Sequence, residues 1–327
     1  MTIAFPHPPG HGGPGSFQER FEKAFLEEGY KVIYADDKQT PDIIFVVGGT
    51  KRLLWLWKMK INGVPIIHRL DGLAWLHRKN GIQSFILGEK GNFVFKFIHS
   101  FLADYVVYQS QFVKQWWDKS GWSKTKGSSV IYNGVDTQLF KPISNSVNPK
   151  SLLCVEGTLD YSPYAIDLLN TLQIELIEKS SYKSLILYGG FQDVKNRYKL
   201  LPAIDYRGKV ARSELPSIYK DAVYLSLDVN AACPNTVIEA LSCGLPVIGF
   251  DTGALKELIH NAGEIVSFGG NPWELKNPSP ESLILAARRV LDSWEDKSKI
   301  ARQLSQRYYT LERMFISYRN IVNKVSN

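Results

Sequence analysis

Short apolar runs alternate with helix-like segments along most of this chain. In the first half the runs fall at residues 3–5, 31–35, 42–47, 64–69, 105–109 and 129–132, with helical patterns at 17–28, 53–61, 93–102 and 111–119. Strands that alternate with helices form parallel sheets, because a parallel neighbour needs a crossover connection. The sequence therefore predicts an α/β fold built from βαβ units.

A second series of the same kind follows residues 141–150, which are rich in Pro, Ser and Asn and are typical of a linker. Its apolar runs fall at 152–156, 184–188, 204–207, 223–227, 246–250 and 264–267, and its helical patterns at 164–178, 215–220, 235–242 and 255–259. After Pro280 the pattern is helical, over 281–292 and 310–324. A chain of 327 residues is long enough for two domains. We expect two Rossmann-like halves and a tail helix that returns to the first.

Charge and cysteine content narrow the functional classes. Residues 1–142 hold 18 basic and 12 acidic side chains, against 21 and 20 in the remainder. No nucleic-acid recognition motif accompanies this excess, so we expect no nucleic-acid partner. The three cysteines are too few for a disulfide framework and lack zinc-site spacing, and the sequence has no apolar run long enough for a membrane span. We expect a cytoplasmic protein without a bound metal or cofactor.

Two loops carry residue types that bind ligands. Gly12 and Gly13 follow the first apolar run, where glycine permits close backbone approach and a helix start offers free amides. Asn235 and Thr236 stand at a second helix start after the run at 223–227, and Glu239 follows one turn later. Free amides there suit phosphates, and a carboxylate suits the paired hydroxyls of a ribose. A sharp glycine turn and a solvated glutamate are the plainer alternatives.

Several segments together resemble family-4 glycosyltransferases of the GT-B fold. The resemblance is carried by Gly12-Gly13-Pro14, by ADYVVYQS at 103–110, by IYNGVDTQLFKP at 131–142, by NTVIEALSCGLPVIG continuing to GALKE at 235–257, and by LERMF at 311–315. It implies an acceptor domain at 1–145, a nucleotide-sugar domain at 146–305 and a helix at 306–327 returning to the first domain. It also implies a cleft between the two domains.

The resemblance further implies roles for single residues. Glu239 would hold the ribose of the donor, while amides around Asn235 and Thr236 would face its diphosphate and sugar. Gly12 and Gly13 would approach the donor from the opposite domain. The loop at 206–210, which includes Lys209 and Val210, would place its main chain against the base.

Two departures from the family pattern concern the donor. Eight positions before Glu239, where the family usually has a second glutamate, stands Ala231, with Asp228 and Asn230 as nearby substitutes. The stretch GTLDYSP at 157–163 lacks the usual arginine and lysine that neutralise the diphosphate. Helix termini, the hydroxyls of the 158–162 stretch, Lys209 and Arg212 would then have to meet the phosphate charge. The hydroxyls in question are those of Thr158, Tyr161 and Ser162.

The acceptor side is expected after the run at 64–69. Asp71 is the first candidate base, because an ionised carboxylate can take a proton from an attacking hydroxyl. His68 is the second, because imidazole titrates near neutrality. A helix N-cap for Asp71 and a structural polar role for His68 are the alternatives.

The resemblance implies a retaining, metal-independent hexosyltransferase in glycan, surface polysaccharide or glycolipid synthesis. It would move a sugar from a nucleotide-sugar to a glycan, lipid-linked or protein acceptor. Basic and aromatic residues interleave at 51–60, which indicates either contact with an anionic membrane or an ordinary amphipathic helix packed on the sheet. A GT-B-like binding or accessory subunit with impaired catalysis, and a nucleotide-sugar epimerase of the same fold class, are the rival interpretations.

Overall fold

The computed structural model describes residues 1–10, 12–76, 82–122, 127–143, 150–178, 182–276 and 278–326. Contacts between residues divide these into two units. The first unit comprises Met1–Asn133 and Glu312–Asn327, and the second comprises Gly134–Leu311. Among the described residues, no helix is both long and apolar enough to span a membrane.

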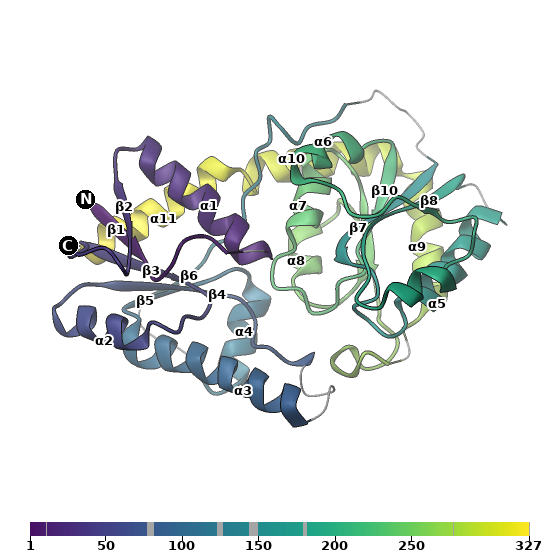
Figure 1. Cartoon of the computed structure of the whole chain (residues 1–327). Helices are drawn as coiled ribbons and strands as arrows, with labels where there is room; N and C mark the ends of the chain where they lie inside the picture. Colours follow the sequence, from purple (N-terminus) through teal and green to yellow (C-terminus); the bar gives the residue numbers. More distant parts are fainter. Residues whose placement is uncertain are drawn as a thin grey trace. The chain divides into compact units, whose positions relative to one another are not determined.

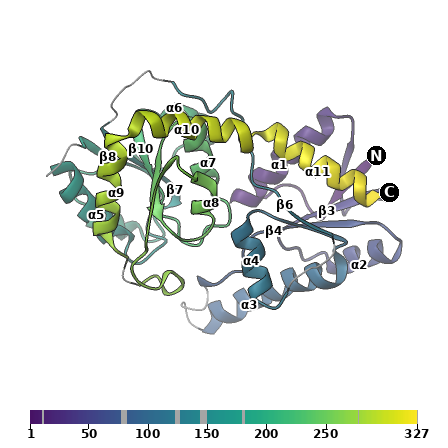
Figure 2. The ribbon, with the colours of Figure 1, turned by 180° about the vertical axis from the view of Figure 1, so that it is seen from behind.

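The first unit is a parallel six-stranded sheet in the order β2-β1-β3-β4-β5-β6. Its strands are β1 (Thr2–Phe5), β2 (Lys31–Tyr34), β3 (Ile43–Val47), β4 (Ile66–Leu70), β5 (Tyr105–Tyr108) and β6 (Ser128–Val130). Helices α1 (Gly12–Glu27) and α11 (Leu311–Ser326) cover one face, and α2 (Leu53–Ile61), α3 (Ile82–Phe97) and α4 (Gln111–Lys119) cover the other (Figures 1 and 2). A π-helical turn, η2 (Ile98–Leu102), extends α3. Four of the five crossovers in this unit are helical, as the sequence predicted, and residues 35–42 connect β2 to β3 without a helix.

Aromatic rings attach the C-terminal helix to the first unit. Phe21 of α1 lies 4.7 Å from Phe45 of β3 and 4.9 Å from Tyr318 of α11, measured between ring centroids. Phe315 of α11 lies 4.8 Å from Phe25 in the same way. Such pairs contribute about 0.5–1.5 kcal/mol each beyond their buried area. The tail helix thus packs on the first unit, as the family resemblance implied.

The second unit is also a parallel six-stranded sheet, in the order β12-β11-β10-β7-β8-β9. Its strands are β7 (Ser151–Thr158), β8 (Ser184–Gly190), β9 (Asp205–Tyr206), β10 (Ala222–Leu225), β11 (Val247–Phe250) and β12 (Gly263–Val266). Helices α5 (Ala165–Leu172) and α9 (Pro280–Asp292) lie on one face, and α7 (Asn235–Ser242) and α8 (Leu255–Ile259) on the other (Figures 1 and 2). The remaining helices are α6 (Leu215–Ile218), α10 (Trp294–Tyr308), the π-helical η3 (Gln173–Glu178) and the 3₁₀ segments η4 (Val194–Lys199), η5 (Arg212–Glu214) and η6 (Pro272–Glu274).

The strand order reverses once in each sheet, between β1 and β3 in the first unit and between β7 and β10 in the second. At such a point the connecting helices leave on opposite faces, and the loops after the two strands separate. Ligands of doubly wound sheets bind in the resulting crevice beyond the carboxyl ends of the strands. The fold therefore directs attention to the loops after these strands.

The division between the units lies earlier than the expected boundary at 145. The Val135 amide donates to the Tyr309 carbonyl at 2.8 Å, and the Leu311 amide donates to the Val135 carbonyl at 3.1 Å. Further along, the Phe140 carbonyl accepts from Ser242 Oγ at 2.6 Å. These bonds tie residues after Asn133 to the second unit. The segment 144–149 of the expected linker lies outside the described residues.

Several helix boundaries differ from the sequence prediction. α1 begins at Gly12 rather than at 17, because the glycines of its first turn are not typical of a helix. α3 begins at Ile82 rather than at 93, because the apolar residues of its early turns lie on all sides and show no helical periodicity. The segment at 164–178 is divided into α5 and the π-helical η3. α10 was not predicted as a separate helix. The three cysteines are buried, and none of them forms a disulfide bond.

Candidate active site

A pocket opens at the point where the second sheet reverses its strand order. It has a volume of about 240 Å³ and lies at the carboxyl ends of β7 and β10. Its lining residues are Glu156, Gly157, Thr158, Leu159, Tyr161, Ser162, Ala165, Leu227 and Asp228. These supply carboxyl and hydroxyl groups, and none of them is basic. The pocket can therefore form many hydrogen bonds to a polar ligand.

Two carboxyl groups in this pocket influence each other's protonation. Burial and, to a smaller extent, the neighbouring Asp228 carboxylate together raise the pKa of Glu156 to about 8. Burial also raises the pKa of Asp228, while the Val229 amide, which donates to it, opposes the rise. The Leu227 amide donates to Glu156 Oε1 at 3.4 Å. Near neutral pH the pair therefore retains a proton on Glu156, which can act as a hydrogen-bond donor.

The stretch at 157–163, where the family places its two cations, is anchored by an acidic side chain. Asp160 accepts from the amides of Gln192 and Asp193 at 2.7 and 3.1 Å, and from Asn196 Nδ2 at 2.9 Å. Burial favours a higher pKa for Asp160, but the hydrogen bonds together outweigh it and lower that pKa. Asp160 thus holds the loop after β7 against the loop after β8, and leaves Thr158 at the pocket.

Lys209 brings a positive charge to the carboxyl end of β8. A Cβ at Gly190 would meet the Lys209 side chain, whose Nζ would lie 3.3 Å from it. Gly190 pairs with Thr158 in the sheet, so the ammonium lies beside the pocket strand. The Lys209 side chain can lie against Gly190 because glycine has no side chain there. Val210 is half-buried and Arg212 is exposed at the start of η5.

The loop after β10 is shaped by close backbone contacts. Asn230 has a left-handed φ of 57°, is 6% exposed, and its Nδ2 has no hydrogen-bond partner among the described residues. Ala231, at the position of the family's second glutamate, accepts from the Ala254 amide at 2.9 Å. Gly253 has a φ of 61°, and a Cβ there would collide with Ala231. In this loop the backbone at Ala231 therefore packs closely against the backbone at Gly253 and Ala254. The glutamate side chain that the family has at position 231 is missing.

The predicted residues at the start of α7 lie on the first turn of that helix. Asn235 begins α7, and its Oδ1 is buried without a hydrogen-bond partner among the described residues. The Thr236 side chain is hydrogen-bonded to Tyr224 of β10. Because the first amides of a helix have no intrahelical acceptor, this turn can bind an anion or a hydroxyl.

Glu239 lies on the buried side of α7. It is 3% exposed, and its Oε2 accepts from the Tyr219 hydroxyl at 3.2 Å. Burial and the Glu239 charge both raise the pKa of Tyr219 well above its ordinary value. Glu239 is not among the residues that line the pocket at β7 and β10. The alternative that Glu239 is a solvated surface residue is thereby excluded. The role of Glu239 toward a ribose stays a prediction.

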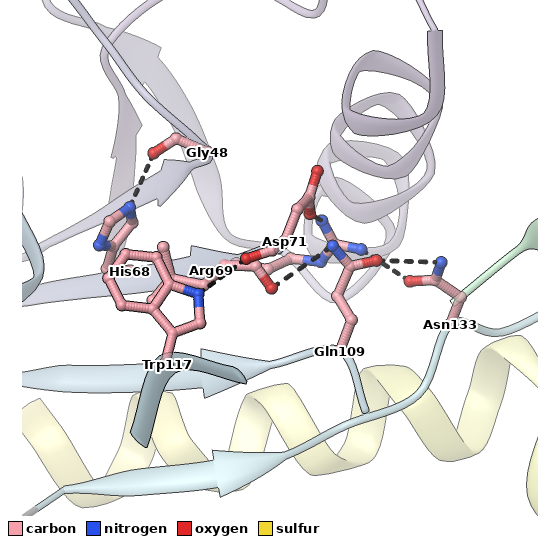
Figure 3. A network of polar contacts seen from close by, with 8 residues as sticks. Gly48, His68, Arg69, Asp71, Gln109, Trp117 and Asn133 are labelled. Atoms are coloured by element: carbon pink, nitrogen blue, oxygen red, sulfur yellow. Dashed lines mark hydrogen bonds and ion pairs between the residues drawn. The ribbon is translucent and has the colours of Figure 1, made fainter. Parts of the chain in front are cut away.

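In the first unit a buried arginine is the centre of a polar cluster at the carboxyl end of β4 (Figure 3). Arg69 is 2% exposed, and its Nη2 donates to Asn133 Oδ1 at 2.7 Å. Its Nη1 lies 3.4 Å from Asp71 Oδ1, and its guanidinium lies 3.7 Å from the Phe17 ring centroid. Asn133 in turn donates to Gln109 Oε1 at 3.3 Å. The cluster links β4, β5, α1 and the NGVD segment.

Asp71 lies at the open side of this cluster. One third of its side chain is exposed, and its backbone carbonyl accepts from Trp117 Nε1 at 2.9 Å. Burial raises the pKa of Asp71, and Arg69 partly opposes that rise. A carboxylate with a raised pKa is a stronger proton acceptor. No helix begins within residues 71–75, so an N-cap role is not seen there.

His68 lies on the opposite face of β4, because successive side chains of a strand alternate. It is fully buried, its Nε2 is 2.7 Å from the Gly48 carbonyl, and its ring lies 6.3 Å from that of Phe95. This environment favours the structural alternative for His68.

Gly12 and Gly13 form the first turn of α1 instead of an open loop before it. A Cβ at Gly13 would meet nothing within 4 Å, whereas one at Gly15 would collide with the Gly10 backbone. The close approach in this loop is therefore between Gly10 and Gly15. The space beside Gly13 is open, and its role toward a donor stays a prediction.

Sequence reasoning missed Glu156 and Arg69 as functional candidates. Each stands inside an apolar run that was assigned as a strand, at residues 152–156 and 64–69. A charged residue near the carboxyl end of such a run is a usable signal, because in a parallel sheet that end faces the ligand side. Among the described residues, no cluster of three or more His, Cys, Asp or Glu could hold a metal ion.

Residues 151–293, which make up most of the second unit, match the family model of glycosyl transferases group 1. The match covers less than half of the 327-residue chain. No curated protein sequence matches the chain. The resemblance to glycosyltransferases that the sequence motifs indicated is confirmed over this segment.

Solved structures extend the likeness to the whole chain. Sucrose-phosphate synthase from Thermosynechococcus elongatus superposes with a TM-score of 0.75 at 16% identity, covering 99% of this chain and 98% of that one. Anabaena HepE in complex with UDP and glucose gives 0.70 at 14% identity, covering 99% and 100%. A glycosyltransferase from Rickettsia africae gives 0.67 at 18%, covering 99% and 98%. The chain thus has the GT-B fold, with two Rossmann-like units, as predicted.

Proposed function

We propose that this chain transfers a sugar from a nucleotide-sugar to an acceptor hydroxyl, with the donor bound at the pocket after β7 and β10. The observation that supports this most directly is the pocket itself, which lies at the strand reversal inside the segment of the glycosyltransferase family. Anabaena HepE, which shares the fold, has been solved with UDP-glucose. A nucleoside diphosphate sugar is therefore the ligand class that we propose.

The chemistry of the pocket suits such a donor in spite of its missing cations. Protonated Glu156 can donate a hydrogen bond to a phosphate or sugar oxygen, and Asp228 can accept from a sugar hydroxyl. Thr158, the first turn of α7 and Lys209 supply further donors. The proton on Glu156 removes one negative charge that would otherwise repel the diphosphate.

We propose that Asp71 receives the proton of the attacking hydroxyl, and that Arg69 holds its carboxylate in place. The support is that Asp71 is partly exposed, while Arg69 is held by Asn133 and Phe17. Following the family resemblance, we propose a retaining reaction that needs no metal. The anomeric configuration of the product, read by NMR, tests retention, and undiminished turnover in a chelator tests metal independence.

The direct experiment offers the full chain a panel of nucleotide-sugars and follows both thermal stabilisation and sugar release. We expect one donor to stabilise the chain above the others and to be consumed, because a ligand that binds only the folded state raises its stability. Thr158→Val should weaken binding of that donor about fivefold, the worth of one hydrogen bond. Thr171→Val is the matched control, since its hydroxyl donates to the Asp167 carbonyl of its own helix.

A binding or accessory subunit with impaired catalysis is the second candidate. Ala231 in place of the family's glutamate and the missing arginine and lysine favour it. Stabilisation by one nucleotide-sugar without any turnover would support this candidate and reject the enzyme. If no nucleotide-sugar either binds or reacts, both candidates fail.

A further inference from the structure

The first unit presents two helices whose outward sides are unusually apolar. α2 and α3 lie on the same face of the first sheet (Figures 1 and 2). Their inward side chains share one core, in which Leu56 and Met59 of α2 and Ile98 and Leu102 of η2 pack against strand residues. The exposed sides of α2, α3 and η2 therefore face away from the sheet together. We call them the outer surface of α2 and α3.

Large apolar side chains recur on this outer surface. The exposed ones are Leu54, Trp57 and Ile61 on α2, Ile82, Phe85, Ile86, Leu87 and Phe93 on α3, and Phe101 on η2. Leu54 is 88% exposed, Ile82 80%, Ile61 70% and Phe93 65%. On the opposite face, Leu26 and Ile316 are the exposed large apolar residues of α1 and α11 among those described. Scattered apolar residues need no explanation, but a concentration of this kind marks an interaction surface.

The same surface is strongly basic. Residues 51–63 and 82–102 contain six basic side chains and one acidic one. The basic ones are Lys51, Arg52, Lys58, Lys60, Lys90 and Lys96, and the acidic one is Glu89. Arg52 pairs with Asp36 and Lys60 with Asp104, while Lys51, Lys58 and Lys90 are exposed. A partner must therefore supply both an apolar phase and negative charge.

We propose that the outer surface of α2 and α3 docks on an anionic lipid bilayer. The headgroups would meet the lysines, and the apolar side chains would enter the boundary between headgroups and acyl chains. A second copy of the chain fits less well, because it would bring two basic surfaces together. The exposed apolar side chains of α2 and α3 can also insert into a lipid layer, because the layer deforms around them. This docking is independent of the proposed sugar transfer.

Sedimentation with vesicles tests the docking. We expect the full chain to pellet with vesicles of phosphatidylcholine mixed with phosphatidylglycerol, to stay in solution with phosphatidylcholine alone, and to be released by salt. Combined replacement of Lys51, Lys58 and Lys90 by Gln should weaken binding by about fivefold per lysine. Combined Leu54→Ser, Ile82→Ser and Phe93→Ser should abolish stable binding, because the apolar contact is lost.

Matched variants come from exposed positions of the second unit. Lys195, Lys256 and Lys299 replaced by Gln, and Val194→Ser with Leu285→Ser, should leave vesicle binding unchanged. Thermal unfolding of each variant verifies that it is folded, since exposed substitutions change stability little. Failure to bind anionic vesicles, or binding that the α2 and α3 variants do not reduce, overturns the proposal. Dimerisation by light scattering that those variants abolish would assign the surface to a second copy instead.

Discussion

The two units place charged groups at the carboxyl edges of similar sheets, but they satisfy these charges differently. In the first unit Arg69 has its partners inside the protein, in Asn133, Asp71 and the Phe17 ring. In the second unit Glu156 and Asp228 are both acidic, so the pair retains a proton near neutral pH, and both line an open pocket. A charged group whose partners lie inside the protein, such as Arg69, is internally compensated and makes a rigid support. Carboxyl groups without a basic partner among the described residues, such as Glu156 and Asp228, remain able to interact with a ligand. The first cluster should therefore govern stability, and the second should respond to pH and to the donor.

Removing the arginine of the first cluster should have the largest effect. Arg69→Met leaves Asn133 and Asp71 without their buried donor, and we expect it to lower the free energy of unfolding by about 3 kcal/mol. Urea denaturation measures this loss. Arg52→Met is the matched control, because the Arg52 and Asp36 side chains are 49% and 75% exposed and should cost about 0.5 kcal/mol at most. Equal losses in the two variants would contradict internal compensation.

The carboxyl pair of the second unit should give a pH dependence of intermediate size. The pKa of Glu156 is raised from 4.5 to about 8, so the folded chain holds this proton more tightly than the unfolded chain. Its contribution to stability is present below pH 4.5 and is lost as the pH rises towards 8. Relative to the wild type, Glu156→Gln should therefore gain about 1–2 kcal/mol over that range, because solvent at the pocket screens part of the effect.

Urea midpoints measured across this pH range for the wild type and Glu156→Gln give the difference directly. The matched control is Glu281→Gln, whose side chain is exposed on α9. Parallel profiles for the wild type and Glu156→Gln would show that Glu156 titrates like a surface carboxyl, and the contrast between the two units would fail.

The smallest effect concerns the cation beside the pocket. Lys209 lies along Gly190, next to Thr158, and we expect Lys209→Gln to weaken nucleotide-sugar binding about fivefold while leaving stability unchanged. Calorimetric titration measures the affinity. Lys195→Gln removes an exposed lysine from the neighbouring η4 and should not change it. A Lys209→Gln variant with wild-type affinity would assign phosphate binding to helix amides and hydroxyls alone.

The sequence was sufficient to predict the fold, because strand periodicity and helix signals are local. Both sheets, the start of α7 and the tail helix follow from such patterns. The charged clusters were not predicted because they depend on strand pairing between distant segments. Glu156 meets Asp228 through the pairing of β7 with β10, and Arg69 of β4 meets Asn133, which follows β6, because β5 pairs with both strands.

Burial also changes the meaning of single residues in ways that the sequence does not reveal. Glu239 follows a helix start, where a solvated carboxylate is common, yet it lies buried against Tyr219. His68 resembles a titratable candidate, yet strand alternation turns it into the core beneath α3. The side of the strand or helix on which a residue lies is decided by packing, which a single sequence shows only in part.

The central claim is that the donor binds at the pocket between the ends of β7 and β10. Amide hydrogen exchange, measured on the full chain with and without the nucleotide-sugar that stabilises it most, tests this claim directly. We predict that the ligand slows exchange at residues 156–162 and 227–236, which surround the pocket and the start of α7. Slower exchange confined to other segments, or no change with any nucleotide-sugar, would contradict it.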